Sequence, residues 1–193
     1  MAKLSPKDFI NTFRPYVLPI AAKYNVPASV LLAQIALESG WLGSSFSQKY
    51  KNLTGMKAMG SPISGIWDGS KSVQATKEDF DGDSKQEAWQ SAFRVYKNYT
   101  QSIEDLAHRH AIRFKFNLNS VGNDINNFID KVVSTGYATG TGYYNGLNTV
   151  IDKYKLYDLD KGAKFIKKTK AAPKAQETKP TTTATTTGGA KKK

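Results

Sequence analysis

One carboxylate stands inside an otherwise apolar stretch, AQIALESGW, at residues 33–41. Glu38 is the only acidic residue between Phe9 and Trp67, and at helical spacing it shares a face with Leu31 and Ile35. We expect it to be partly buried, because burial raises the pKa of a carboxyl group and keeps it protonated near neutral pH. Such a group can give its proton to a leaving oxygen. The alternative is a glutamate at a helix end that turns toward water or bonds a neighbouring amide.

A second carboxylate facing Glu38 across a cleft would complete the pair used in glycoside hydrolysis, one acid and one base or nucleophile. The next acids along the chain are Asp68, Glu78, Asp79, Asp81, Asp83 and Glu87. Spacing in the sequence does not show which of them faces Glu38. The run of aspartates also fits a polar turn, and its spacing fails the calcium-binding EF-hand pattern.

Aromatic residues surround these acids, and aromatic faces with a few polar groups suit a sugar-binding cleft, although such residues also fill cores. They are Trp41, Trp67, Trp89, Tyr96, Tyr99, Tyr137, Tyr143 and Tyr144. His108 and His110 are the only histidines, and on a helix their spacing points them apart. The chain has no cysteine and no phosphate-cradling or nucleophile-elbow motif. We therefore expect no metal and no cofactor.

The elements that must hold these groups are mostly helical. The pattern predicts a helix over residues 6–24, broken or bent at Pro15 and Pro19, and a second over 28–39 that Gly40 closes. Short strands around the DGD turn, between residues 72 and 99, predict a hairpin. Further helices are expected from Ser102, over 125–133 and over 147–154. The fold class is α+β, predominantly α, with a small β-hairpin lobe.

The positive charge of the chain belongs mainly to its end. Residues 1–160 hold 18 Lys or Arg against 15 Asp or Glu, a net charge of +3. Residues 161–193 hold ten Lys against one Glu, a net charge of +9, in a Lys/Thr/Pro-rich composition typical of a disordered tail. We expect one domain over 1–160. The tail is either simply solvated or attracted to an anionic polymer such as nucleic acid or bacterial cell wall. A basic nucleic-acid-binding face is not indicated.

Residues along this domain resemble the peptidoglycan N-acetylglucosaminidases of glycoside hydrolase family 73. The matching segments lie in family order over roughly residues 5–157: VLLAQIALESGW (30–41), KNLTGMKA (51–58), ATKEDF (75–80), FRVY (93–96), and GYAT (136–139) followed by Tyr143 and Leu147. The resemblance implies a lysozyme-like domain that cleaves the β-1,4 bond after N-acetylglucosamine in the glycan strand. The motif E-S-G also occurs in lytic transglycosylases, which remain an alternative, as does a non-catalytic wall-binding module.

The resemblance also implies roles for individual residues. Glu38 falls on the general acid, Glu78 on the second carboxylate, and Tyr137 on a tyrosine near the sugar. The positions expected to line the cleft or bind substrate are Trp41, Asn52, Asp79 and Tyr143. The chain departs from the family where GTG (140–142) replaces Asp-Pro-x, and where Asp79 beside Glu78 leaves two candidates for the second carboxylate. Attack by water or by the acetamido group of the substrate are both open.

The N-terminal residues contain no long apolar run, so neither a signal peptide nor a membrane span is indicated. We expect a monomer that is made as a soluble cytoplasmic protein and acts on the cell wall. Release at phage lysis or carriage in a virion would bring it there.

Overall fold

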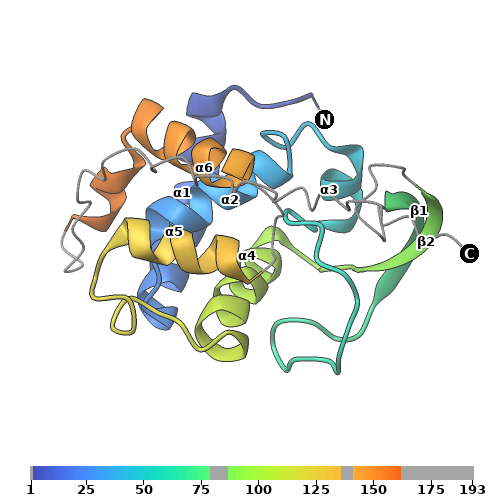
Figure 1. Ribbon diagram of the computed structural model, residues 1–193. Helices are drawn as coiled ribbons and strands as arrows, with labels where there is room; N and C mark the ends of the chain where they lie inside the picture. The colour runs from blue at the N-terminus through green and yellow to red at the C-terminus, as the bar shows by residue number, and fades with distance from the viewer. Residues whose placement is uncertain (1, 79–86, 136–140, 162–193) are drawn as a thin grey trace, which may run out of the picture.

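The computed structural model describes residues 2–78, 87–135 and 141–161, with the side chains of 76–78, 87–89 and 141 outside that description. Its elements are α1 (Pro6–Tyr24), α2 (Ala28–Glu38), α3 (Ser45–Tyr50), β1 (Lys71–Glu78), β2 (Glu87–Arg94), α4 (Tyr99–His108), the π-helix η1 (Arg109–Arg113), α5 (Ile125–Ser134), α6 (Thr141–Lys153) and the 3₁₀ helix η2 (Leu156–Asp160). A helical body carries one antiparallel hairpin (Figure 1). The predicted class, mostly helical with a small β lobe, is confirmed.

Helix α2 is the centre of the core. Residues 28–36 are all buried, and α1, α4, α6 and η2 pack against this helix. A helix that is apolar on every side is stable only inside a protein, which explains its central place. Its first residue follows Pro27, whose side chain cannot cap it, and Asp160 of η2 accepts the Ala28 N–H at 2.7 Å instead. The predicted bounds, 28–39 with Gly40 beyond, are confirmed to within one residue.

Helix α1 begins with a conventional cap and runs without interruption. The Ser5 hydroxyl accepts the Asp8 N–H at 3.2 Å, which satisfies one free donor of the first turn. Pro15 and Pro19 both lie inside the helix, so a break is wrong, whereas a bend at these residues stays a prediction. The predicted apolar face is confirmed: four of its buried residues are Phe9, Phe13, Val17 and Ile20.

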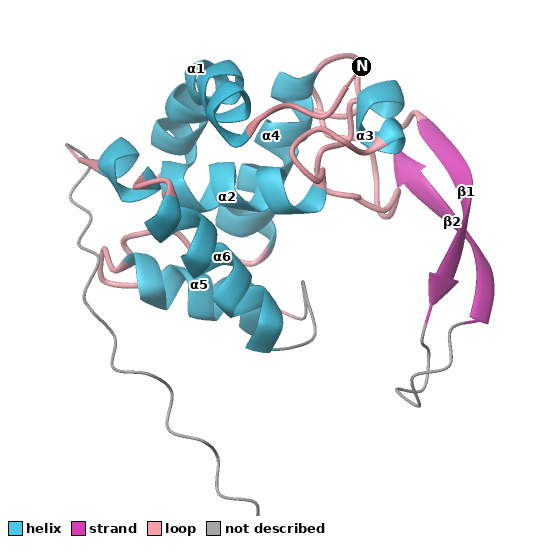
Figure 2. Cartoon of the chain, turned by 90° about the horizontal axis from the view of Figure 1, so that it is seen from above, coloured by secondary structure: helices cyan, strands magenta, loops and turns pink. Residues whose placement is uncertain are grey.

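The hairpin projects to one side of the helical body, as Figure 2 shows. Its strands pair from Lys71 with Arg94 to Glu78 with Glu87. The predicted hairpin is therefore present, but β2 ends at Arg94, and the expected strand over 92–99 is wrong beyond that point. Asn98 accepts the Gln101 N–H at 3.0 Å and so starts α4 at Tyr99, three residues earlier than expected.

A buried ion pair fastens the base of the hairpin to the helices. The Arg94 guanidinium donates to Asp105 of α4 at 2.7 Å, and the Tyr96 hydroxyl donates to the same carboxylate oxygen at 2.5 Å. Arg94 also lies over the Trp67 ring, 4.0 Å from its centroid. These contacts fix the direction in which the hairpin leaves the body.

The remaining elements differ from expectation mainly in length. Helix α5 is confirmed, and Asp124 caps it by accepting the Asn126 N–H at 2.8 Å. Helix α6 begins at Thr141, six residues before the predicted start at Leu147. The sequence pattern did not predict α3, η1 or η2. Over the described residues, no helix combines the length and apolar character needed to cross a bilayer.

Candidate active site

The end of α2 places Glu38 at the edge of the helical body. The Ser39 hydroxyl donates to the Ile35 carbonyl at 2.6 Å and accepts the Leu42 N–H at 3.0 Å, so it closes the helix and starts the turn. Gly40, Trp41 and Leu42 all have left-handed backbones, with φ of 57°, 59° and 61°. Such a turn stops α2 abruptly and leaves the Glu38 side chain beside open space.

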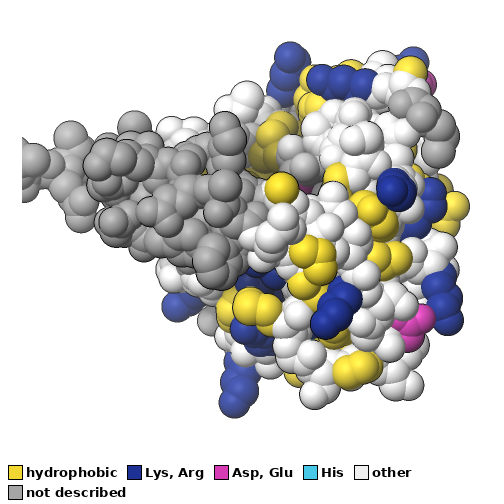
Figure 3. All heavy atoms as spheres, turned by 90° about the vertical axis from the view of Figure 1, so that its right-hand side faces the viewer, with side chains coloured by type: hydrophobic (Ala, Val, Ile, Leu, Met, Phe, Trp, Pro, Cys, Tyr) yellow, Lys and Arg dark blue, Asp and Glu magenta, His cyan; other side chains and the backbone are white. Residues whose placement is uncertain are grey.

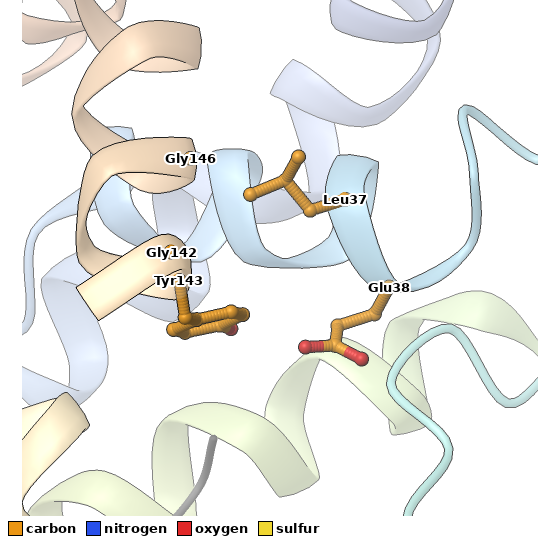
Figure 4. Close-up of a pocket in the computed structure, with 5 residues that line it drawn as sticks. All are labelled: Leu37, Glu38, Gly142, Tyr143 and Gly146. Atoms are coloured by element: carbon orange, nitrogen blue, oxygen red, sulfur yellow. The ribbon is translucent and has the colours of Figure 1, made fainter. Parts of the chain in front are cut away.

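That space is a pocket of about 370 Å³ between α2 and α6. Its lining consists of Leu37, Glu38, Gly142, Tyr143 and Gly146. The two glycines have no side chain to fill the gap, and Figure 4 shows the Glu38 carboxylate and the Tyr143 ring facing each other across it. The structure thus brings Glu38 and Tyr143 together from positions 105 residues apart.

Part of the Glu38 side chain is exposed to solvent. Its pKa is nevertheless raised, first by desolvation, while a hydrogen bond from Tyr143 acts in the opposite direction. The two observations agree physically, because protein around a pocket displaces water from a carboxylate that still touches solvent. The structure therefore has a carboxyl group that is accessible to a ligand and whose pKa is raised above its ordinary value.

A chain of polar groups runs from this pocket into the core. The Tyr143 hydroxyl hydrogen-bonds to Glu38 and accepts from the Gln34 amide nitrogen at 3.3 Å. The Gln34 amide oxygen lies 2.9 Å from Nε2 of His110. Gln34 is four residues before Glu38, so both project from one face of α2. Sequence reasoning missed Gln34, although a buried amide in an apolar run is the same kind of signal that singled out Glu38.

His110 is fully buried in η1, and burial, aided by the nearby Arg109 charge, lowers its pKa to about 3. The imidazole is therefore neutral at physiological pH. His108 instead lies against Tyr24, with ring centroids 6.2 Å apart, which confirms that the two histidines point to different surroundings. Within the described ranges, no group of three or more His, Cys, Asp or Glu residues is arranged to hold a metal ion.

Asn52 is not one of the residues that line this pocket, and its contact with substrate stays a prediction. The side chain is fully buried. Its nitrogen donates to the carbonyls of Met56 and Arg94 at 3.1 and 2.9 Å, and its oxygen accepts the N–H groups of Thr54 and Met56 at 3.4 and 3.0 Å. Every hydrogen-bonding position of the amide is used. Asn52 joins the loop of residues 51–60 to the end of β2.

Trp41 has a packing role in the structure. Its ring meets Phe9 and Tyr154 edge to face, with centroids 5.5 and 5.3 Å away, and it is not one of the pocket-lining residues. This packing helps hold the left-handed turn after Glu38. A direct contact of Trp41 with substrate stays a prediction.

The other predicted site residues are only partly placed or not placed. Glu78 is the last residue of β1 and stands opposite Glu87, but its side chain is outside the description. Asp79, Tyr137 and the tail over 162–193 lie outside the described residues.

The chain matches known proteins over most of this domain. Residues 14–156 match the family model Glucosaminidase, described as mannosyl-glycoprotein endo-beta-N-acetylglucosaminidase. The peptidoglycan hydrolase FlgJ of Vibrio parahaemolyticus is 35% identical over 145 residues, which make up 72% of this chain and 44% of that protein. The exo-glucosaminidase LytG of Bacillus subtilis is 26% identical over 157 residues, covering 79% of this chain and 52% of that protein. The chain thus spans about half the length of these relatives or less.

Solved structures agree with the fold. The catalytic domain of the autolysin Auto from Listeria monocytogenes superposes with a TM-score of 0.67 and 26% identity, over 83% of this chain and 91% of that domain. The expectation of a mostly helical, lysozyme-like domain with a hairpin lobe is confirmed.

Proposed function

The chain belongs to the glucosaminidase family, glycoside hydrolase family 73, and from this membership we propose that it is a glycoside hydrolase that cleaves peptidoglycan. The observation that carries the proposal is the carboxyl group of Glu38, which opens into a pocket and has a raised pKa. The family match does not by itself identify the acid, whereas this pocket contains one specific carboxyl group, that of Glu38.

In the proposed reaction, Glu38 is the general acid. A protonated carboxyl group gives its proton to the oxygen of the leaving sugar, and the carboxylate that remains accepts a hydrogen bond from Tyr143. Desolvation favours the neutral acid before the proton transfer, and the tyrosine hydroxyl stabilises the charge that forms during it. Desolvation raises the pKa of Glu38 and the hydrogen bond from Tyr143 lowers it, so together they adjust the pKa of a group that must first hold a proton and then release it.

The bond we propose is the β-1,4 linkage after N-acetylglucosamine. The names of the relatives support a glucosaminidase, although the family model is described as an endo-enzyme and LytG as an exo-glucosaminidase. Endo cleavage is our proposal for this chain. Its product would carry N-acetylglucosamine at the new reducing end.

Purified cell wall treated with the protein tests this directly. The soluble products are reduced and analysed by mass spectrometry, and new N-acetylglucosamine reducing ends are the expected result. Anhydromuramic ends would instead indicate a lytic transglycosylase, and wall binding without any cleavage would indicate a binding module.

Two variants separate the role of Glu38 from a general effect of changing a helical glutamate. Glu38→Gln keeps the size of the side chain but has no proton to give, so the rate should fall by about 10²- to 10⁴-fold. Glu104→Gln is the matched control on α4, where that carboxylate bonds Lys23 and Tyr24. Full activity in Glu38→Gln would remove Glu38 from the mechanism.

For the second carboxylate we propose Glu78, with Asp79 as the alternative candidate. Glu78 ends β1 at the far end of a hairpin whose base is fixed by Arg94 and Asp105. Glu78→Gln and Asp79→Asn, compared in the same assay, decide between them. The anomeric form of the first product then shows whether water attacks on the opposite face, as expected for carboxyl groups about 6.5 to 9.5 Å apart, or whether configuration is retained.

The setting of the enzyme also remains a proposal. We propose that the basic tail over 161–193 contacts anionic wall polymers and that the protein is a monomer released at phage lysis or carried in a virion. Figure 3 shows that Lys and Arg side chains are spread over the visible part of the hairpin face as well, which is compatible with an anionic target.

A further inference from the structure

Three buried or half-buried polar side chains stand in line behind the proposed acid. The line passes from His110 of η1 to Gln34 of α2, then to Tyr143 of α6, and ends at Glu38. His110 and Gln34 are both fully buried, so water does not compete for their contacts. Burying a polar side chain costs free energy unless it makes hydrogen bonds. The hydrogen bond between Gln34 and His110 therefore holds both buried side chains in position.

The hydrogen bonds have one direction. The Gln34 amide nitrogen donates to the Tyr143 hydroxyl at 3.3 Å, so the amide oxygen is the atom left for His110 at 2.9 Å. An amide oxygen only accepts, and therefore the neutral imidazole must carry its hydrogen on Nε2. The tyrosine oxygen accepts from Gln34, so its own hydrogen is the one that bonds the Glu38 carboxylate, which the Tyr143 ring faces across the pocket. Each donor in the line faces toward Glu38.

From this geometry we infer that Gln34 and His110 are positioning residues that act on Glu38 through Tyr143. They hold the tyrosine hydroxyl in the one rotation that donates to the carboxylate. Loss of the Gln34 donor removes a constraint on this rotation and should weaken the hydrogen bond from Tyr143 to Glu38. Donors that are oriented before the reaction stabilise developing charge without a reorganisation step.

The consequence for catalysis rests on the proposed function, because a positioned donor matters to the rate only if Glu38 is the group that loses a proton. The positioning itself is a property of the folded protein without substrate. The titratable and charged groups near the line are Tyr143 from α6 and His110 and Arg109 from η1. His110 is neutral, and the side chain of Glu78 on the hairpin is outside the described residues.

Carbon-13 NMR of the glutamate side-chain carboxyl groups measures the titration of Glu38 directly, with Glu38→Gln used to assign its signal. Tyr143→Phe should raise the titration midpoint, because the donor that favours the ionised form is gone. Gln34→Met, which keeps the length of the side chain, should raise it in the same direction. The double variant should show the same midpoint as Tyr143→Phe alone, since Gln34 acts only through the hydroxyl.

Controls separate this role from a structural one. Gln101→Met changes a glutamine whose contacts are with Lys97, Asn98 and Gly65, and it should leave the midpoint of Glu38 unchanged. His110→Phe, which suits a site lined by the Phe116 and Phe128 rings, tests the same inference if Gln34→Met does not fold. In that variant the amide is free to turn over, and the midpoint should again rise.

The pH dependence of glycan cleavage is a second measurement of the same effect. The alkaline limb of kcat/KM, which follows loss of the proton from the acid, should move to higher pH in Gln34→Met. An unchanged midpoint in Gln34→Met, or an equal further rise when it is added to Tyr143→Phe, overturns the inference. If the wild-type protein cleaves no glycan at any pH, the proposed function fails, while the NMR result still decides whether the line of hydrogen bonds positions Tyr143.

Discussion

Replacing Asp160 by Asn should change how the stability of the protein depends on pH. Asp160 ends η2, is buried, and accepts the Ala28 N–H at 2.7 Å and the Ser29 N–H at 3.4 Å. It therefore caps α2 from 132 positions further along the chain. Asn has the same shape and keeps an oxygen that accepts these N–H groups, so the substitution removes the ionisable group with little change in packing.

The size of the effect follows from the pKa of Asp160. Desolvation raises this pKa from 3.8 to about 6, against the opposing hydrogen bonds from Ser29 and Ala28. The two values differ by about two pH units, and at about 1.4 kcal/mol for each unit this corresponds to about 3 kcal/mol of folding free energy. Because the pKa is raised in the folded state, the contribution is fully present below pH 3.8 and is lost as the pH rises through about 6.

Urea denaturation of the wild type and Asp160→Asn at several pH values between about 4 and 7 tests this. The stability of the wild type relative to the variant should fall by about 2.4 kcal/mol from pH 4 to pH 7, because part of the full effect is already lost at pH 4. Other titrating groups cancel in this difference. Asp158→Asn on the same short helix is the control, since its exposed pair with Lys161 should contribute less than about 1 kcal/mol. A relative stability of the wild type that instead grows with pH would show that the helix N–H groups outweigh desolvation, and would refute the reasoning.

Three further outcomes are expected. Asn52→Ala should lower the free energy of unfolding by about 1 to 3 kcal/mol, because it leaves buried backbone groups without partners; unchanged stability with a raised KM would instead indicate a role in substrate binding. Asp105→Asn should cost about 3 to 5 kcal/mol and speed hydrogen exchange in β2, because it leaves the buried Arg94 charge unpaired; a loss below about 1 kcal/mol contradicts the anchoring role of this pair. Removal of residues 162–193 should weaken sedimentation with purified wall at low salt, and the difference should vanish near about 0.5 M salt; a difference that persists there speaks against charge attraction.

The sequence predicts the framework of the site well because its signals are local. The apolar run before Glu38 and the glycine after it define α2, and the alternation around the DGD turn predicts the hairpin. A local sequence pattern predicts the wrong structure where tertiary packing determines the conformation of the backbone. Pro15 and Pro19 suggest a break, but α1 continues through both.

The parts of the site that the sequence does not show depend on partners that are distant in the chain. Gln34 and Tyr143 are separated by 109 positions, and no spacing rule connects them. Asn52 falls in a family segment and looks like a binding residue, yet its four hydrogen bonds all go to the backbone of the surrounding loop and of Arg94. A polar residue in a family motif can thus stabilise the backbone of the loop that contains the motif.

The π-helix η1 has a consequence for the divergence of related chains. Such a turn corresponds to an α-helical turn with one residue inserted, and it lies directly after α4 in the segment that holds His110. In a lineage that lost one residue here, the helix would continue as an ordinary α-helix and each later side chain would rotate by about 100°. Gln34 would then meet a different neighbour. Among homologous sequences, we expect an alignment gap at this turn to coincide with a change of the residues aligned with Gln34 and His110.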